Sequence, residues 1–98
     1  MNEQIRSLST LDRVIHEPGR LMIVALLSAV KEADFLFLQT ETGINKGTLS
    51  SHLARLEEAG YIEITKTFRG KIPQTLLRLT DAGRRAFAAY RKSLKSAI

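Results

Sequence analysis

Small polar residues and a glycine open a segment, residues 45–59, that is otherwise patterned as an amphipathic helix. Leu49, Leu53 and Leu56 recur at spacings of four and three, which places them on one face of that helix. The opposite face is small, polar or basic, with Gly47, Ser50, Ser51, Ala54 and Arg55, and Lys46 at its start. Small residues let a helix approach a groove floor closely, and serine hydroxyls bond to base edges or phosphates. The segment therefore carries the chemistry of a nucleic-acid contact.

A tight turn comes directly before this helix. Asp34 is the expected N-cap of a helix over about 36–42, and Gly43 is placed to end it in a left-handed conformation. Asn45 is the expected N-cap of the next helix, 46–59, which Gly60 ends in the same way. The free N–H groups at the start of the second helix also favour a phosphate there. Two helices joined in this way predict a helix-turn-helix whose second member is the recognition helix.

A β-hairpin with a basic tip follows the recognition helix. Residues 61–68 alternate in the manner of a strand and contain β-branched residues, so they are the expected first strand. Residues 75–80 are the expected returning strand. Arg69 and Lys71 flank Gly70 at the reversal, where they can hold phosphates or enter a minor groove; a solvated turn is the alternative. We expect Phe68 and Pro73 to shape the base of this hairpin rather than to contact nucleic acid.

The remaining elements are helical. We expect a short helix over 9–16 with Ser9 as its N-cap, a central core helix with Pro18 in its first turn, and a last helix over 81–95. The fold class is mainly α with a β-hairpin wing, a winged helix-turn-helix, in one domain over residues 1–98. Both ends of the chain carry more apolar residues than such a core needs, which predicts that they form a two-fold homodimer interface.

Composition agrees with a DNA-binding function without requiring it. The 98 residues include 15 Lys and Arg against 10 Asp and Glu, a formal charge of +5, and no cysteine. This charge permits nucleic-acid binding, and the missing cysteines exclude disulfides, thiolate metal sites and a cysteine nucleophile. No signal peptide is visible, and the apolar run 21–30 is about half a membrane span. We expect a cytoplasmic protein without a membrane partner.

No catalytic or metal-binding constellation is recognisable. His52 flanks the apolar helix face, so a packed or hydrogen-bonded role is expected, and no second ligand accompanies His16. Glu57 and Glu58 diverge by about 100° on a helix and cannot act as an acid–base pair. The sequence predicts no enzyme, no cofactor and no metal.

The stretch "GINKGTLSSHLARLEEAGYIEITKTFRGKIPQTLLRLTDAGRRAF" resembles small, single-domain winged-helix DNA-binding regulators related to the MarR and ArsR families. The resemblance, which spans roughly residues 10–95, implies a homodimeric, cytosolic prokaryotic repressor or activator. The cysteine motifs of metal-sensing ArsR relatives are absent. Together with the residue patterns, it predicts that double-stranded DNA meets Asn45, Lys46, Gly47, Thr48, Ser50, Ser51, Arg55, Arg69 and Lys71.

A winged helix can also serve as a protein-interaction or assembly module without specific DNA binding, and this is the alternative function. An apolar exposed face on the recognition helix would favour it. The small and polar residues at positions 47, 50 and 51 favour DNA. The sequence does not identify an operator or an effector.

Overall fold

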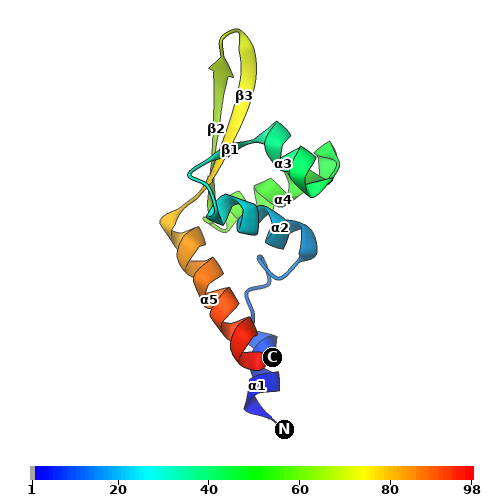
Figure 1. Cartoon of the computed structure of the whole chain (residues 1–98), viewed down its shortest axis with the longest axis vertical. Helices are drawn as coiled ribbons and strands as arrows, with labels where there is room; N and C mark the ends of the chain where they lie inside the picture. Colours follow the sequence, from blue (N-terminus) through cyan, green and yellow to red (C-terminus); the bar gives the residue numbers. More distant parts are fainter. Residues whose placement is uncertain (1) are drawn as a thin grey trace.

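The computed structural model describes residues 2–98 as a group of packed helices with a long hairpin projecting from one end (Figure 1). In chain order the elements are α1 (Glu3–Arg6), the short 3-10 helix η1 (Ser7–Thr10), α2 (Pro18–Ser28), β1 (Ala33–Asp34), α3 (Phe35–Thr42), α4 (Lys46–Glu58), β2 (Ile62–Arg69), β3 (Ile72–Leu79) and α5 (Asp81–Ala97). This order and the projecting hairpin form a winged helix-turn-helix, as the sequence predicts.

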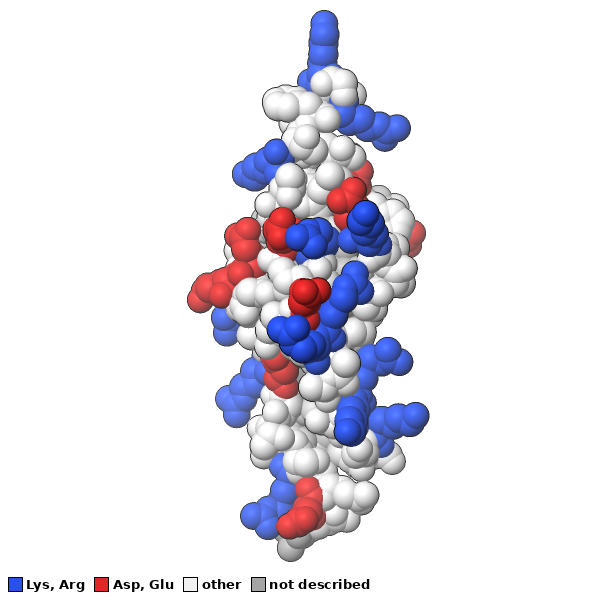
Figure 2. All heavy atoms as spheres, turned by 90° about the vertical axis from the view of Figure 1, so that its left-hand side faces the viewer, with Lys and Arg blue, Asp and Glu red and all other residues white. Residues whose placement is uncertain are grey.

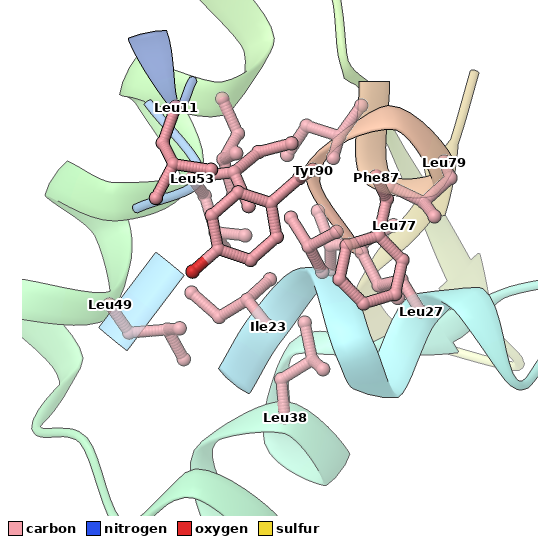
Figure 3. Packing of buried hydrophobic residues seen from close by; sticks show 14 residues of the cluster. Leu11, Ile23, Leu27, Leu38, Leu49, Leu53, Leu77, Leu79, Phe87 and Tyr90 are labelled. Atoms are coloured by element: carbon pink, nitrogen blue, oxygen red, sulfur yellow. The ribbon is translucent and has the colours of Figure 1, made fainter. Parts of the chain in front are cut away.

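Helix α2 is the centre of the core. Pro18 occupies its first turn, and the Glu17 side chain caps it by accepting a hydrogen bond from the Arg20 backbone N–H at 2.8 Å. Helices α3 and α4 pack against α2, and the inner sheet face closes the core (Figure 3). The buried cluster contains Leu11, Ile15, Ile23, Val24, Leu27, Leu38, Leu49, Leu53, Leu56, Ile62, Leu77, Leu79, Phe87 and Tyr90.

The turn between α3 and α4 has the geometry that the sequence predicts. The Asp34 carboxylate accepts a hydrogen bond from the Phe37 N–H at 2.7 Å and starts α3. Gly43 ends that helix with a φ of 70°, a left-handed conformation that glycine adopts without steric cost. The Asn45 side chain then accepts from the Thr48 N–H at 2.9 Å. These caps confirm both predicted helix starts and fix the direction of α4.

The three strands form an antiparallel sheet in the order β1-β3-β2. Strands β2 and β3 pair from Ile62 with Leu79 out to Arg69 with Ile72, which leaves a two-residue loop. Gly70, the first loop residue, has a φ of 64°, and no other residue type has a positive φ in the part of the chain described. This pattern fits a type II′ hairpin turn. The wing is longer than predicted, because β3 begins at residue 72 rather than 75.

Two local predictions differ from the structure. The helix expected over 9–16 is wrong: α1 and η1 lie earlier, and turns occupy most of residues 11–17. The Asp12 carboxylate stabilises these turns by accepting hydrogen bonds from the N–H groups of Val14 and Ile15, at 2.8 and 3.2 Å. Strand β1 was not predicted, because two residues are too short to show a periodic pattern.

Helix α5 begins at Asp81 and is capped by Thr80, whose hydroxyl accepts a hydrogen bond from the Gly83 N–H at 3.0 Å. It buries Phe87 and Tyr90 against the core and then runs beside α1 and η1, away from the wing (Figure 1). Within residues 2–98 no helix combines the length and the apolar character needed to cross a membrane.

Candidate nucleic-acid interface

The outer face of α4 is built as the sequence predicts. Leu49, Leu53 and Leu56 are buried and hold the helix against the core. The predicted contact residues of this helix and its cap are exposed: Asn45, Lys46, Gly47, Thr48, Ser50, Ser51 and Arg55. The side-chain Oδ1 of Asn45 accepts the capping hydrogen bond from the Thr48 N–H, so this residue stabilises the helix start as well as lying on its exposed end.

Gly47 is not required by the packing of the protein itself. It lies in the first turn of α4 without a positive φ. A Cβ atom at this position would have Asn45 Oδ1, 3.7 Å away, as its nearest neighbour, which is an ordinary contact. The fold would therefore accept alanine, which is also the better helix former. What the glycine provides is a helix surface without a side chain at the point where a partner would approach.

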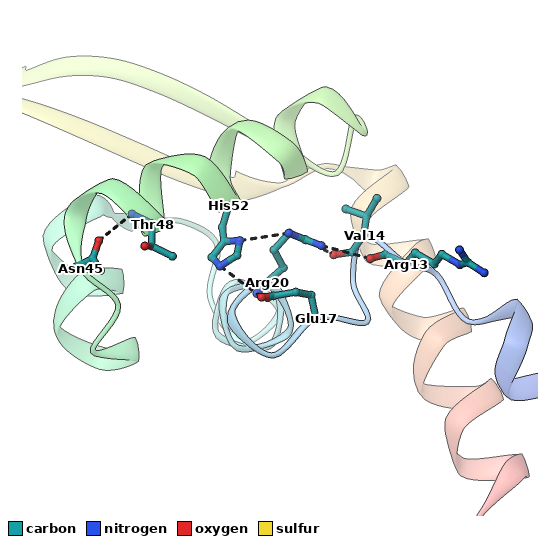
Figure 4. Close-up of polar contacts among 7 residues, drawn as sticks. All are labelled: Arg13, Val14, Glu17, Arg20, Asn45, Thr48 and His52. Carbon is teal, nitrogen blue, oxygen red and sulfur yellow. Dashed lines mark hydrogen bonds and ion pairs between the residues drawn. The ribbon is translucent and has the colours of Figure 1, made fainter.

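A polar cluster fastens the recognition helix α4 to the start of α2 (Figure 4). The His52 ring faces Arg20, with Nδ1 3.3 Å from the guanidinium, and Glu17, with Nε2 3.6 Å from the carboxylate. The Arg20 backbone N–H stabilises the ionised Glu17 side chain and lowers its pKa, with the charges of His52 and Arg20 acting in the same direction. His52 is thus hydrogen-bonded, as expected, and it positions α4.

Arg55 lies one turn deeper on α4 than Ser51. Its guanidinium is 4.0 Å from the carboxylate of Glu58, and both side chains are substantially exposed. A pair of this kind is weak, because solvent screens it and the side chains lose conformational freedom. Arg55 is therefore available to an anionic partner at little cost.

The wing carries its predicted cations at the outer end. Arg69 and Lys71 are exposed on either side of Gly70. Within residues 2–98 neither of them has an acidic partner within 4.0 Å. Figure 2 shows Lys and Arg side chains at this end of the molecule, while the acidic side chains visible in that view lie lower, on the body and at the opposite end.

An open groove of about 560 Å³ runs between α3, α4 and the wing. Lys46 and Ser50 of α4 line one wall, and Lys66 and Thr75 of the hairpin line the other. Ammonium and hydroxyl groups from two elements thus face one channel, which the carboxylates of Asp34 and Glu57 also line. Lys66 was missed by sequence reasoning, although strand alternation from Ile64 was a signal that could have found it.

The prediction that Phe68 and Pro73 shape the base of the wing is wrong. They pair with each other next to the terminal Arg69–Ile72 pair. Phe68 is 68% exposed and Pro73 is exposed. The reason is the greater strand length: the hairpin continues past the core, so these residues lie near its outer end.

The described residues contain no group of three or more His, Cys, Asp or Glu side chains that could hold a metal ion. His16 contacts the Tyr90 hydroxyl through Nδ1 at 2.8 Å. Neither histidine therefore has the companions that a metal site needs.

A comparison with known protein families identifies the fold at the level of sequence. The sequence model described as "Winged helix DNA-binding domain" matches residues 20–98. The chain belongs to this family. An uncharacterised protein of Methanocaldococcus jannaschii is 32% identical over 79 residues, which cover 80% of this chain and 85% of that relative.

Solved structures agree with this assignment. A transcriptional regulator homologue from Pyrococcus horikoshii matches with a TM-score of 0.87 and 27% identity, covering 93% of this winged-helix chain and 92% of the other. A MarR-family transcriptional regulator from Silicibacter pomeroyi matches with a TM-score of 0.69 over 97% of this chain and 64% of its own, and its 18% identity supports the fold alone. The resemblance to winged-helix DNA-binding regulators is confirmed at the level of the family and the fold.

Proposed function

We propose that this winged-helix protein is a transcriptional regulator that binds a specific sequence of double-stranded DNA as a homodimer. The observation that carries the proposal is the exposed first turn of α4, where Gly47 lies between Lys46 and Thr48, beside a groove whose opposite wall is the wing. Because the family and its solved relatives are DNA-binding domains and regulators, the proposed activity is binding rather than catalysis.

In the proposed complex α4 enters the major groove with its N-terminal end. Lys46, Thr48, Ser50 and Ser51 meet phosphates or base edges there, and Gly47 lets the helix backbone approach. Arg55 reaches the groove from the next turn. Arg69 and Lys71 hold the backbone or minor groove beside it through the wing, and the excess of 15 basic over 10 acidic residues favours this contact.

The homodimer is proposed from the opposite end of the molecule. There α1, η1 and the C-terminal part of α5 lie side by side and extend away from the helices of the core (Figure 1). Ile5 and Ile98 are 56% and 90% exposed, and Leu8 and Leu94 are half-buried on these elements. A second copy would cover this surface and present two recognition helices about 34 Å apart, one turn of DNA. Acting on chromosomal DNA, such a regulator would work in the cytoplasm.

One observation favours the alternative of a protein-interaction module. Leu36 and Phe37, on the first helix of the pair, are 70% and 42% exposed. An apolar partner could dock there. The polar face of α4 and the basic wing give DNA the stronger case, because an apolar partner would not require either of them.

Selection of bound duplexes from a random pool tests the proposal, followed by affinity measurements against salt with the selected site. We expect a palindromic site, and binding that weakens steeply as salt rises because phosphate contacts release counterions. Lys31→Ala, at an exposed cation outside α4, the wing and the proposed dimer surface, is the matched control for losing one charge per copy, and its salt slope should stay near that of the wild type. Absent enrichment, or binding that is insensitive to salt, would overturn the proposal.

A further inference from the structure

The two faces of the wing carry different side chains beyond the core. Paired residues in an antiparallel hairpin point to the same side, and successive residues point to opposite sides. Ile62 and Ile64 point to the core, so Lys66 and Phe68 follow on this inner face. Their partners Thr75 and Pro73 lie on the same face. The inner face is thus the one that borders the groove beside α4.

The outer face ends in a different apolar residue. Ile72 pairs with Arg69 and is 70% exposed, nearly the same exposure as the 68% of Phe68. The two side chains lie one pair apart on opposite faces of the hairpin. Only Phe68 shares its face with the groove wall formed by Lys66 and Thr75.

We infer that Phe68 is an apolar wedge that enters the minor groove of the bound duplex, with Lys66 behind it on a phosphate. This inference rests on the proposed DNA binding and adds to it a contact that is neither cationic nor on the recognition helix. Phenylalanine is among the side chains that minor-groove proteins insert between base steps or against the groove walls.

Charge identifies the partner as anionic. Residues 64–75 contain three cations, Lys66, Arg69 and Lys71, and no acidic residue. Phe68, with these cations close to it in the sequence, suits a surface that combines phosphates with apolar sugar and base edges. A purely apolar protein surface would leave these cations desolvated without partners.

The rigid hairpin lowers the entropy cost of placing Phe68 in the minor groove. The two-residue turn at Gly70 and the continuous pairing out to Arg69 and Ile72 hold Phe68 on a preformed strand. Little conformational entropy is then lost when its side chain is buried in the complex. Lys46, Ser50 and Lys66, which line the groove together with Asp34 and Glu57, would bind the phosphate backbone from its two walls, and Phe68 lies farther out on the hairpin.

The test compares Phe68→Ala with the matched control Ile72→Ala on the duplex selected by the wild-type protein. We expect Phe68→Ala to weaken binding roughly tenfold, the effect of losing one buried aromatic contact, and Ile72→Ala to bind within about twofold of wild type. The slope of log K against log salt should be unchanged in Phe68→Ala, because no charge is lost. In Lys66→Ala it should fall by about 1.8, which is about 0.9 for each of the two copies in the dimer.

Hydroxyl-radical footprinting gives a second readout, because the radical attacks sugars from the minor groove. The wild type and Ile72→Ala should protect a minor-groove position next to the α4 site, and Phe68→Ala should lose this protection while keeping the major-groove contacts. Equal affinities and footprints for the two variants would overturn the inference while leaving DNA binding intact. If the wild type itself bound no duplex, the proposed function would fail first.

Discussion

The Tyr61 hydroxyl donates a hydrogen bond to the carboxylate of Asp12, and so ties the segment before α2 to the residue that follows the recognition helix. The same tyrosine accepts a hydrogen bond through its backbone carbonyl from the Thr80 N–H at 3.0 Å, just before α5. One residue therefore links the end of α4, the start of α5 and the N-terminal segment.

This link predicts a specific dependence of stability on pH. The hydrogen bond to Asp12, with burial and the negative charge of Asp12 acting in the same direction, raises the pKa of Tyr61 from 10.0 to about 12. The folded state thus holds the phenolic proton more tightly than the unfolded state. Its contribution is fully present below pH 10 and is lost as the pH rises to about 12.

Tyr61→Phe should lower the free energy of unfolding by about 1 kcal/mol at pH 7, because one hydrogen bond to a carboxylate is lost. Denaturant unfolding of both proteins from pH 7 to 12 measures this difference. The gap between wild type and variant should shrink above pH 10. A gap that stays constant up to pH 12 would show that the hydrogen bond does not set the tyrosine's protonation.

Local signals in the sequence determined much of the fold. The caps Asp34 and Asn45 and the glycines at positions 43 and 60 predicted the helix pair, because each acts within a few residues of itself. The length of the wing was harder to predict from the sequence. Its outer residues are held by partner strands rather than by burial, so no hydrophobic alternation marks their end.

The N-terminal prediction failed for a related reason. A Ser and an Asp three residues apart fit a helix start, but Asp12 instead caps a turn and accepts from Tyr61, which is distant in sequence. The predicted contact residues of α4 could be placed on one surface by periodicity alone. Strand alternation from Ile64 could have placed Lys66 and Phe68 on the inner face of the hairpin, but how close that face lies to α4 depends on tertiary packing, which no local pattern encodes.

Two glycine substitutions should separate stability from DNA binding. Gly47→Ala should raise the free energy of unfolding by about 0.5 kcal/mol, because alanine is the better helix former and has room. It should nevertheless weaken DNA binding severalfold, because a methyl group would stand between α4 and the groove floor. Unfolding curves and affinities measure the two effects, and unchanged affinity would remove Gly47 from the interface.

Gly83→Ala is the contrasting variant. A Cβ at this position would overlap the Tyr61 backbone carbonyl oxygen, so α5 would have to shift. We expect a loss of stability of about 2 kcal/mol or more. Full stability of Gly83→Ala in urea unfolding would mean that α5 can move without cost.

The basic residues of α4 and of the wing should contribute differently to DNA binding. Arg55→Ala should reduce the discrimination between the selected site and unrelated duplexes, because a guanidinium in the major groove contacts base edges. Arg69→Ala and Lys71→Ala should weaken binding to all sequences alike, because phosphate contacts carry no base information. Affinities for matched and mismatched duplexes at one salt concentration measure this ratio. Uniform losses from all three variants would contradict the assigned roles.

The proposed homodimer makes a prediction for the end of the molecule opposite the wing. Ile5→Asp together with Ile98→Asp introduces charge at side chains that are 56% and 90% exposed in the single chain, so the monomer fold should be retained. In a dimer these side chains would be buried, and their charges would disfavour association. Analytical ultracentrifugation should show a dimer for the wild type and a shift to monomer for the variant.

The affinity of the variant for a palindromic duplex should fall because dimerisation is lost, while its affinity for a half-site should change little. A wild type that stays monomeric at high concentration would refute the dimer without affecting the assignment of α4 as the recognition helix.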